Sequence, residues 1–496
     1  MATSNIPSDL VGPIFTFDVQ SGGQFSAETR TMILGHGLAG GSLAEGGIAV
    51  CNTATDARNL AGAGSMLEAM FLDARANAPT QEIWIGRVAD SGTAEIRTLT
   101  VGTVPSAGGQ GVLQIGGEIV SVEIAAGTSA NDVATALAAA INAYFNQASK
   151  QSLPFTATAA TNVVTLTARH KGTYATGIDI HVPVLDRVNA FAGLFTFATT
   201  TAGAGVPSVA NILAAMNDDP FEIIICPFND DTNLGLINDF LDEVSGRWSY
   251  LQQIYGHCFY PFADTSTELI AKAEAKDTWH LTMIPQFTAG GFAIPLYRWV
   301  SMFTARTASL LGDGAGGGVS VNQTGLVVKG AIAPRDRAYW MDYTTRNTFY
   351  KNGVSGWKID KSGNVMVDKI ITQSQTINGA PDTTFRDIQR VFQLTYALKR
   401  FRADLAYEHS NKAIADDNPG NNPNISTTAD IKATLYHSYR RMADNGVLEN
   451  ADEALQAMTV TRNSDNPNRV DTYLPLDFVN ALDIFAGVAR AYAQFD

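Results

Sequence analysis

Hydrophobic and polar positions alternate along the chain in two rhythms, which separate it into regions. From residue 29 to 91, and again from about 208 to 290, apolar runs of strand length alternate with helical spacings. "EIWIGRV" (82–88) and "FEIIICPF" (221–228) predict buried strands, whereas "TNLGLINDFLDEVSGR" (232–247) predicts a helix. Strands and helices that alternate at these lengths predict a parallel or mixed α/β sheet.

Residues 92–205 break that rhythm. Their strands are rich in Thr, Val and Ile and are separated by glycine turns, and a single Ala-rich helix with Ser129 or Asn131 as its cap interrupts them. Because the α/β pattern resumes afterwards, the segment is expected to be an inserted β-rich domain whose ends lie close together.

A third pattern follows residue 330. Alternating strands are expected there, with turns at Asn352-Gly353 and Ser362-Gly363. A helix is expected from a cap at Asp382 or Thr383 to about Glu408, and another over 428–446 that Gly446 stops. The apolar stripe of the first helix is predicted to comprise Phe385, Ile388, Phe392, Tyr396, and Leu398 or Leu405.

Both ends of the chain read as extended segments. Near the N-terminus, Phe15, Phe17 and Val19 lie on one face of a half-buried strand, with Ile14, Thr16 and Asp18 on the other. A strand so near a terminus needs a partner in its own chain or in another chain. The positions that we expect to pair are Val11, Ile14, Phe15, Phe17 and Val19 at one end, and Ile484, Ala486, Val488 and Tyr492 at the other.

Composition narrows the function. Charged residues make up 17% of the 496 residues, below the roughly 25% of ordinary soluble proteins, so either an assembly covers much of the surface or the surface is rich in Gly, Ala and Thr. A net charge of −14 argues against a nucleic-acid binder. The three scattered cysteines suggest a reducing compartment. No secretory signal or membrane-spanning run is expected, so we expect no membrane insertion.

Two motifs could carry chemistry. Gly35-His-Gly-Leu-Ala-Gly40 matches the GxGxxG spacing of dinucleotide sites and has Asp56 near the distance of a ribose ligand, but the residues that follow are poor helix formers. Asp230 and Asp231 follow a predicted strand and could bind a metal, although such residues more often cap the next helix. A nucleotide- or metal-dependent α/β enzyme is therefore the alternative from another functional class.

A basic set is the remaining feature. It lies on the predicted helix near residues 383–408 of an otherwise acidic protein, and either faces solvent or docks an acidic partner. The set is Arg386, Arg390, Lys399, Arg400 and Arg402.

The order of these patterns resembles the contractile phage tail sheath proteins of the Mu-like branch. "SGNVMVDKIITQSQTINGAPDTTFRDIQRVFQLTYALKRFR" (362–402) is similar to their C-terminal core signature, with its G-x-P-D turn at Gly379-Ala-Pro381-Asp382. The inserted segment, "IPSDLVGPIFTFDV" (6–19) and "LPLDFVNALDIFAGVARAYAQF" (474–495) also resemble that branch.

The resemblance implies a structural protein, with no enzyme activity and no cofactor. Such sheaths are helical stacks of rings, expected to be hexameric, around a tail tube, and their terminal arms add strands to neighbouring subunits. Expected partners are further copies of the chain, the tube protein, and the baseplate and tail terminator proteins, with no direct contact to nucleic acid. The protein is expected in the virion tail after assembly in the bacterial cytoplasm. The sheath of a phage-derived bacteriocin or injection device is a second reading.

The expected fold is multidomain, α/β and α+β. We expect an N-terminal arm (1–20), a mixed α/β domain (21–91 with 206–345), an inserted β-rich outer domain (92–205), a sheath core domain (346–468) that neighbours' strands complete, and a C-terminal strand and arm (469–496). Linkers near residues 20–23 and 463–468 are expected to act as hinges during contraction, and the basic set is the candidate surface for docking on the tube.

Overall fold

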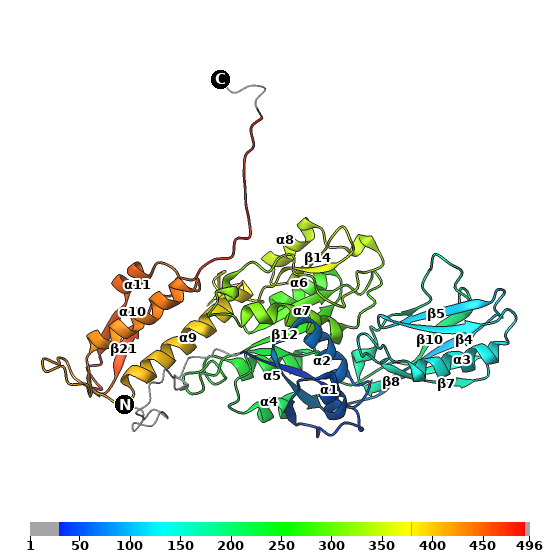
Figure 1. Cartoon of the computed structure of the whole chain (residues 1–496), viewed down its shortest axis with the longest axis horizontal. Coiled ribbons are helices and arrows are strands. Elements are labelled where there is room, and N and C mark those ends of the chain that lie inside the picture. The colour runs from blue at the N-terminus through cyan, green and yellow to red at the C-terminus, as the bar shows by residue number, and fades with distance from the viewer. Residues whose placement is uncertain (1–28, 378, 492–496) are drawn as a thin grey trace, which may run out of the picture.

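The computed structural model describes residues 29–377 and 379–491. The described part is elongated, with a central α/β region, a β-rich region at one end, and a helical region at the other from which the C-terminal tail projects (Figure 1). No helix of the described residues is long and apolar enough to cross a membrane.

A six-stranded sheet forms the centre. Its order is β13-β12-β11-β1-β3-β2, parallel throughout except for β2, which runs antiparallel to β3. The strands β1, β11 and β13 are almost wholly buried, as expected for a parallel sheet covered on both faces. The strands are β1 (Arg30–His36), β2 (Ile48–Val50), β3 (Glu82–Val88), β11 (Ile223–Ile225), β12 (His257–Ala263) and β13 (Leu281–Gln286).

Helices connect and cover these strands, and α7 is buried along most of its length. They are α1 (Ala54–Ala61), α2 (Met66–Asn77), α4 (Ala210–Met216), α5 (Asp231–Leu241), α6 (Ser266–Lys276) and α7 (Leu296–Leu311). The predicted α/β rhythm, including the strand at residues 82–88, is confirmed.

The β-rich end comprises residues 93–204, and its two ends meet at an antiparallel bridge between Thr93 and Ala204. The approach is close: a Cβ atom on Gly92 would lie 1.8 Å from the Ala204 carbonyl oxygen, so only glycine fits there. This region holds a four-stranded sheet (β10-β4-β8-β7), a three-stranded sheet (β6-β5-β9) and α3 (Ala130–Ala143), which Ser129 caps. The strands are β4 (Ala94–Val101), β5 (Gly109–Ile115), β6 (Glu118–Ile124), β7 (Phe155–Ala160), β8 (Val163–Lys171), β9 (Ile180–His181) and β10 (Phe195–Thr201).

A buried ion network, which we call the buried joint, attaches this region to the α/β sheet. The Arg298 guanidinium on α7 donates to both oxygens of Asp73 on α2, at 2.7 and 3.1 Å, and to Glu118 Oε1 on β6, at 3.1 Å. Burial lowers the pKa of Arg298, but the two facing carboxylates outweigh that effect and raise the pKa above its ordinary value. Each charge is thus paired out of water, which fixes one arrangement of the two regions.

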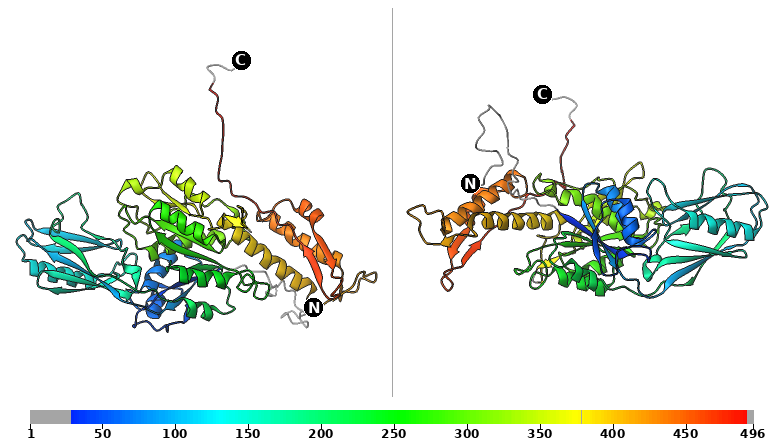
Figure 2. Two further views of the ribbon diagram at one scale, coloured as in Figure 1. Left: turned by 180° about the vertical axis from the view of Figure 1, so that it is seen from behind. Right: turned by 60° about the horizontal axis from the view of Figure 1, so that its bottom comes forward.

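The C-terminal region contains two long helices, α9 (Ile388–His409) and α10 (Thr428–Asp444), which pack together beside a short hairpin of β20 (Thr459–Arg462) and β21 (Val470–Tyr473). Figure 2 shows this hairpin at the end of the molecule opposite the β-rich region. The remaining elements are α8 (Tyr343–Lys351), β14 (Gly356–Ile359), β15 (Val365–Lys369), β16 (Thr376–Ile377), β17 (Ala380–Pro381), β18 (Ala413–Ile414), β19 (Ile425–Ser426) and α11 (Ala451–Ala457).

The predictions for residues 343–353 and for the start of the long helix were wrong. Residues 343–351 form the helix α8, with Asp342 as its cap, so that Asn352-Gly353 ends a helix and only Ser362-Gly363 lies in a hairpin turn. The long helix begins at Ile388, after Asp387, instead of near Asp382.

Residues 385–387 precede this helix because the preceding chain pairs with them: Thr372 N donates to Arg386 O at 2.8 Å, and Ile371 forms a bridge with Asp387. Phe385 therefore lies outside the helix and stacks on Trp279. The helix residues that are buried are Ile388, Gln389, Val391, Phe392, Gln393, Thr395, Tyr396, Ala397 and Phe401. Leu405 is partly buried and packs against the core, so it continues the stripe.

Candidate assembly interfaces

The C-terminal tail is held to the body through residues 478–483. Phe478 is buried and forms a bridge with Leu448, and Val479 N donates to Val447 O at 3.1 Å. From α9, Gln393 Nε2 donates to Val479 O at 2.8 Å. The base of the tail is therefore fixed to the pair of long helices.

Asp483 is the last residue with such anchors. Its carboxylate pairs with Lys369 and accepts from Asn322 Nδ2 at 3.1 Å, and the same amide donates to Leu482 O at 2.8 Å. We call the contacts of Asn322, Lys369 and Asp483 the tail clamp. They set the place and direction in which the chain leaves the body.

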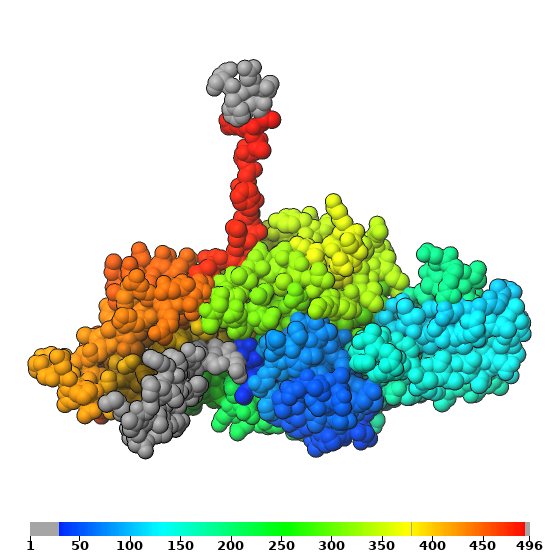
Figure 3. All heavy atoms as spheres, viewed as in Figure 1, coloured from blue at the N-terminus to red at the C-terminus, as the bar shows by residue number. Residues whose placement is uncertain are grey.

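Beyond the clamp the tail is bare. Residues 484–491 are extended, form no strand with the rest of the described chain, and project into solvent (Figure 3). Phe485 is 90% exposed and Val488 is 91% exposed, and Ile484 and Ala486 are exposed as well. Large apolar side chains in such numbers on an unsupported segment are typical of an interaction surface.

The other predicted pairing positions lie outside the described residues. This applies to Tyr492 and to the N-terminal set of Val11, Ile14, Phe15, Phe17 and Val19. The described chain begins at Thr29, and the backbone N–H of Arg30 donates to Glu222 Oε2 at 2.8 Å. Glu222 also pairs with Lys399 of α9, so the start of the described chain is tied to the C-terminal region.

The structure separates the five basic residues. Arg390 donates to Asn480 Oδ1 at 2.8 Å and covers the Phe478 ring, so it supports the tail base. Lys399 pairs with the buried Glu222, and Arg400 pairs with Asp404 at 2.9 Å. Arg386 lies before the helix, beside Asp387, and Arg402 is exposed and donates to Gln253 O at 3.4 Å.

The glycine loop after β1 is shaped by packing. It leads to the strand β2 and not to a helix. A Cβ atom on Gly41 would lie 2.4 Å from Leu60 O, and Leu38 N already donates to Ala61 O at 2.7 Å. Asp56 belongs to the capping box of α1. Within the motif, a Cβ atom on Gly37 would lie 2.8 Å from Arg87 Cδ, whereas one on Gly40 would meet nothing within 4 Å. Packing therefore accounts for Gly37 and Gly41, and the capping box for Asp56, without a bound nucleotide.

The two candidate metal ligands have structural partners. Asp230 caps α5 by accepting from Asn233 N at 2.9 Å. Asp231 accepts from Lys272 and Lys276, and these hydrogen bonds lower the pKa of its carboxyl to about 2. Within residues 29–377 and 379–491, no group of three His, Cys, Asp or Glu side chains could hold a metal ion.

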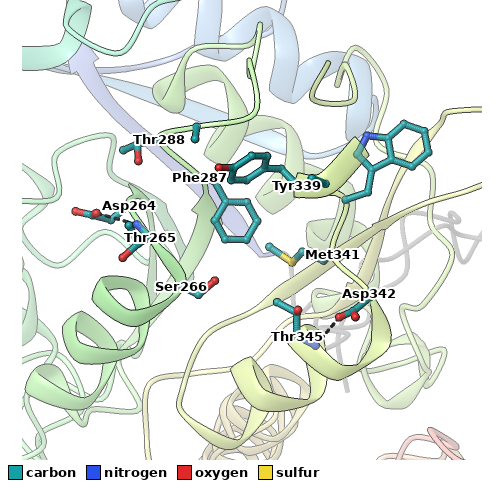
Figure 4. Close-up of a pocket in the computed structure, with 12 residues that line it drawn as sticks. Asp264, Thr265, Ser266, Phe287, Thr288, Tyr339, Met341, Asp342 and Thr345 are labelled. Carbon is teal, nitrogen blue, oxygen red and sulfur yellow. Dashed lines mark hydrogen bonds between the residues drawn. The ribbon is translucent and has the colours of Figure 1, made fainter. Parts of the chain in front are cut away.

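A pocket of about 410 Å³ lies where β12 and β13 end (Figure 4). Phe287, Tyr339 and Met341 are among its apolar lining residues. Its two carboxylates accept backbone N–H groups: Asp264 from Thr265 at 2.8 Å, and Asp342 from Thr345 at 2.7 Å. Both carboxylates therefore serve the starts of helices α6 and α8.

Comparison with known proteins shows a similarity of fold and a similarity of sequence. No family model matches the chain. The chain shares its fold with the crystal structure of the sheath tail protein from Desulfitobacterium hafniense, with a TM-score of 0.51 and 12% identity over 95% of this chain and 97% of that chain. The mixed α/β multidomain architecture thus matches that of the solved sheath tail protein.

The sequence is also similar to a tail sheath protein of a Mu-like prophage. The chain is 26% identical over 499 residues to the Mu-like prophage FluMu tail sheath protein of Haemophilus influenzae, covering 97% of this chain and 98% of the relative. The resemblance to the tail sheath proteins of the Mu-like branch is confirmed.

The sequence did not reveal the tail clamp or the contacts of the basic set. Asn322 and Lys369 lie more than a hundred residues from Asp483 along the chain. A weak signal was available: Asp477, Asn480 and Asp483 are isolated polar residues in the otherwise apolar segment 474–488.

Proposed function

We propose that the protein is the structural subunit of a contractile tail sheath. Copies polymerise as a helical stack of rings, hexameric by the family resemblance, around a tail tube. On contraction they rotate to a wider and shorter lattice and drive the tube through the host envelope. The observation that carries the proposal is the anchored tail, whose exposed apolar residues Ile484, Phe485 and Val488 pair with no strand of the described residues.

The tail is proposed to act by adding a strand to a neighbouring subunit. Main-chain hydrogen bonds give such a contact its affinity, and alternate side chains give it register. A contact between two different surfaces, repeated without closure, builds a helical array.

The hairpin of β20 and β21 is the proposed receiving surface. It is two-stranded among the described residues, and isolated two-stranded hairpins are marginal in water. Added strands from the arms of neighbouring copies would complete a sheet of ordinary size. The five-part division of the chain predicted above, with its arms and outer domain, is part of the proposal.

We propose the hinge of the C-terminal arm at a place other than the expected linker near residues 463–468. Residues 463–468 lie in the tight turn between β20 and β21, where Asn463 N donates to Arg469 O at 2.9 Å and Asn463 Oδ1 accepts from Asn466 N at 2.8 Å. Such a turn is rigid. The bend during contraction is therefore proposed at Asp483–Ile484, where the tail clamp ends.

Docking on the tube is proposed through the exposed members of the basic set. Of the five residues, Arg402 is exposed and the Arg386 side chain is 37% exposed, whereas Arg390 and Lys399 hold internal partners. The other proposed partners are the baseplate and tail terminator proteins, in a virion assembled in the bacterial cytoplasm. The alternative proposal, the sheath of a phage-derived bacteriocin or injection device, rests on the same tail and basic-set contacts.

Deletion of residues 1–20, or of the segment after Asn480, tests the proposal. Each deletion is expected to give a folded monomer by size-exclusion chromatography, with no tubes by negative-stain microscopy, whereas the full chain forms tubes. Phe485→Ser with Val488→Ser is the finer variant. Its matched control is Val104→Ser with Ile119→Ser, which changes two exposed apolar residues outside the tail. Normal tubes from the tail variants would refute the proposed role of the tail.

The enzyme alternative has its own test. A nucleotide- or metal-dependent enzyme would gain thermal stability on adding a nucleotide or divalent cation, since a ligand that binds the folded state stabilises it. A sheath subunit is expected to show no such gain.

A further inference from the structure

The loop over residues 242–256, between α5 and β12, exposes an unusual apolar surface. Val244 is 77% exposed, Tyr250 is 78% exposed and Leu251 is 75% exposed. We call these three residues the loop patch. Large apolar side chains gathered on one short segment point to a surface that is covered in some state of the protein.

The loop is built to hold this shape. Gln253 and Tyr255 adopt positive φ angles of 51° and 65°, which is strained for side chains of their size. The Arg247 side chain is fully buried and donates to Tyr255 O and Asn217 O, both at 3.3 Å. Trp248 Nε1 donates to Gly256 O at 2.9 Å. Backbone strain that is held by so many contacts indicates a shape kept for binding and not a loose connection.

The described chain begins next to this loop. Glu222 accepts from Arg30 N with its carboxylate, and its carbonyl accepts from His257 N, the residue directly after the loop, at 2.9 Å. The ten residues from 20 to 29 can span at most about 35 Å, which gives the preceding segment 14–19 ample reach to the loop.

The chemistry of the N-terminal segment matches the patch. Phe15, Phe17 and Val19 are predicted from the sequence to share one apolar face, and residues 1–20 contain two acidic side chains, Asp9 and Asp18, and no Lys or Arg. The loop, in contrast, has a cation beside it: the exposed Arg402 donates to Gln253 O. Apolar surface and charge are therefore complementary.

We infer that the loop patch is the resting site of the N-terminal strand: in the unassembled subunit, residues 14–19 of the same chain cover Val244, Tyr250 and Leu251, and they leave when the strand is passed to a neighbour. The inference rests on the proposed exchange of the N-terminal strand. A docked strand keeps both apolar surfaces out of water, so it delays polymerisation until other subunits offer a better partner.

Disulfide trapping tests the docking in the full-length monomer. Leu251→Cys is combined in turn with Phe15→Cys, Phe17→Cys and Val19→Cys, and the native Cys51, Cys226 and Cys258 are all buried. Under mild oxidation, at least one pair is expected to form an intrachain disulfide roughly tenfold faster than the same N-terminal cysteine with Val104→Cys, because docking raises the effective concentration of the thiols. Peptide mapping identifies the bond.

Two results would overturn the inference. Equal rates for the test and control pairs would show that the strand does not rest on the patch, and disulfides that join only two different chains would assign the patch to a second copy. These readouts use the monomer. They are therefore independent of whether deletion of residues 1–20 abolishes tubes, which tests the strand exchange itself.

Leu251→Asp tests the delay. The variant is expected to polymerise after a lag several times shorter than that of the unmodified chain, with an unchanged circular dichroism spectrum, because a carboxylate repels the apolar strand. Val104→Asp is the control and is expected to keep the normal lag. An unchanged lag in Leu251→Asp would overturn the claim that docking delays assembly.

Discussion

The buried joint and the tail clamp both attach a segment through charged side chains, but they differ in their access to water. At the joint, Arg298, Asp73 and Glu118 are buried and pair with one another. At the clamp, Lys369 and Asp483 remain partly exposed. Water can replace a contact at the clamp but not at the joint. The β-rich region is therefore expected to be attached more firmly than the tail.

Breaking the joint is expected to have the largest effect. Arg298→Met leaves two carboxylates buried without their cation, which is expected to destabilise the fold by about 3–5 kcal/mol. Calorimetric unfolding measures the loss. The control is Arg335→Met: this residue pairs with Asp179 of the β-rich region at 2.6 Å but is 45% exposed, so its loss is expected to cost about 1 kcal/mol or less. Equal losses for the two variants would contradict the distinction between buried and exposed attachment.

Acid is expected to lower the free energy of unfolding through His36, the last residue of β1. Burial, with the nearby His170, lowers the pKa of His36 to about 4. As the pH falls below about 6.5, the unfolded chain takes up a proton at this site that the folded chain refuses until about pH 4. Stability is therefore lost across that window, on the order of 2–3 kcal/mol.

Asp90 acts in the same direction. Burial opposes its ionisation, but hydrogen bonds from His170 and the charges of both histidines hold its pKa below the usual range. Its contribution is lost as the pH falls through that lowered pKa. Thermal unfolding at several pH values measures the slope, which His36→Asn should flatten. An unchanged slope in His36→Asn would show that other groups carry the acid sensitivity.

Loosening the clamp is expected to have a smaller and local effect. Asp483→Ala removes one partner of Lys369 and of Asn322, while Lys369 keeps Asp387 at 3.1 Å and Asn322 keeps Leu482 O at 2.8 Å. The partly exposed pair contributes about 0.2–1 kcal/mol to global stability. Amide hydrogen exchange at residues 479–483 is expected to rise while exchange in α9 stays unchanged. Asp465→Ala, in the turn between β20 and β21, is the control and should leave the tail base as it was.

The basic set gives the smallest effect on stability. Arg402→Gln is expected to change the free energy of unfolding by no more than about 0.5 kcal/mol. If Arg402 faces the tube, the variant should bind tube protein more weakly at low salt and converge with the unmodified chain at high salt, because screening removes the contribution of the charge. Sedimentation with purified tube protein measures it. Identical binding at every salt concentration would remove Arg402 from the docking surface.

The sequence predicted what repeats locally and missed what depends on distant contacts. The α/β rhythm, β3, and α10 with Gly446 after it all follow from periodicity and capping. The sequence could not predict where α9 begins, because the backbone of residues 386–387 pairs with Thr372 and Ile371, which precede the predicted cap in the sequence. The region 343–351 has β-prone Thr and Tyr residues, but the cap at Asp342 and the burial of Phe349 favour a helix.

The candidate interfaces show the same division. The amphipathic pattern drew attention to Ile484 and Val488, which the structure exposes. The basic set could not be resolved from spacing, since Glu222 and Asn480, the partners of Lys399 and Arg390, lie far from them in the sequence.

Gly92 and Ala204 lie close together where the chain enters and leaves the β-rich region. This region is therefore expected to tolerate removal or exchange by protein engineering. Its two entry points are already joined by a bridge, so a short peptide could close the gap after excision, or a foreign module could be grafted there for display along the outside of a tube. Excision would take Glu118 away and leave Arg298 facing Asp73 alone, a one-to-one pair that keeps the remaining body electrically balanced.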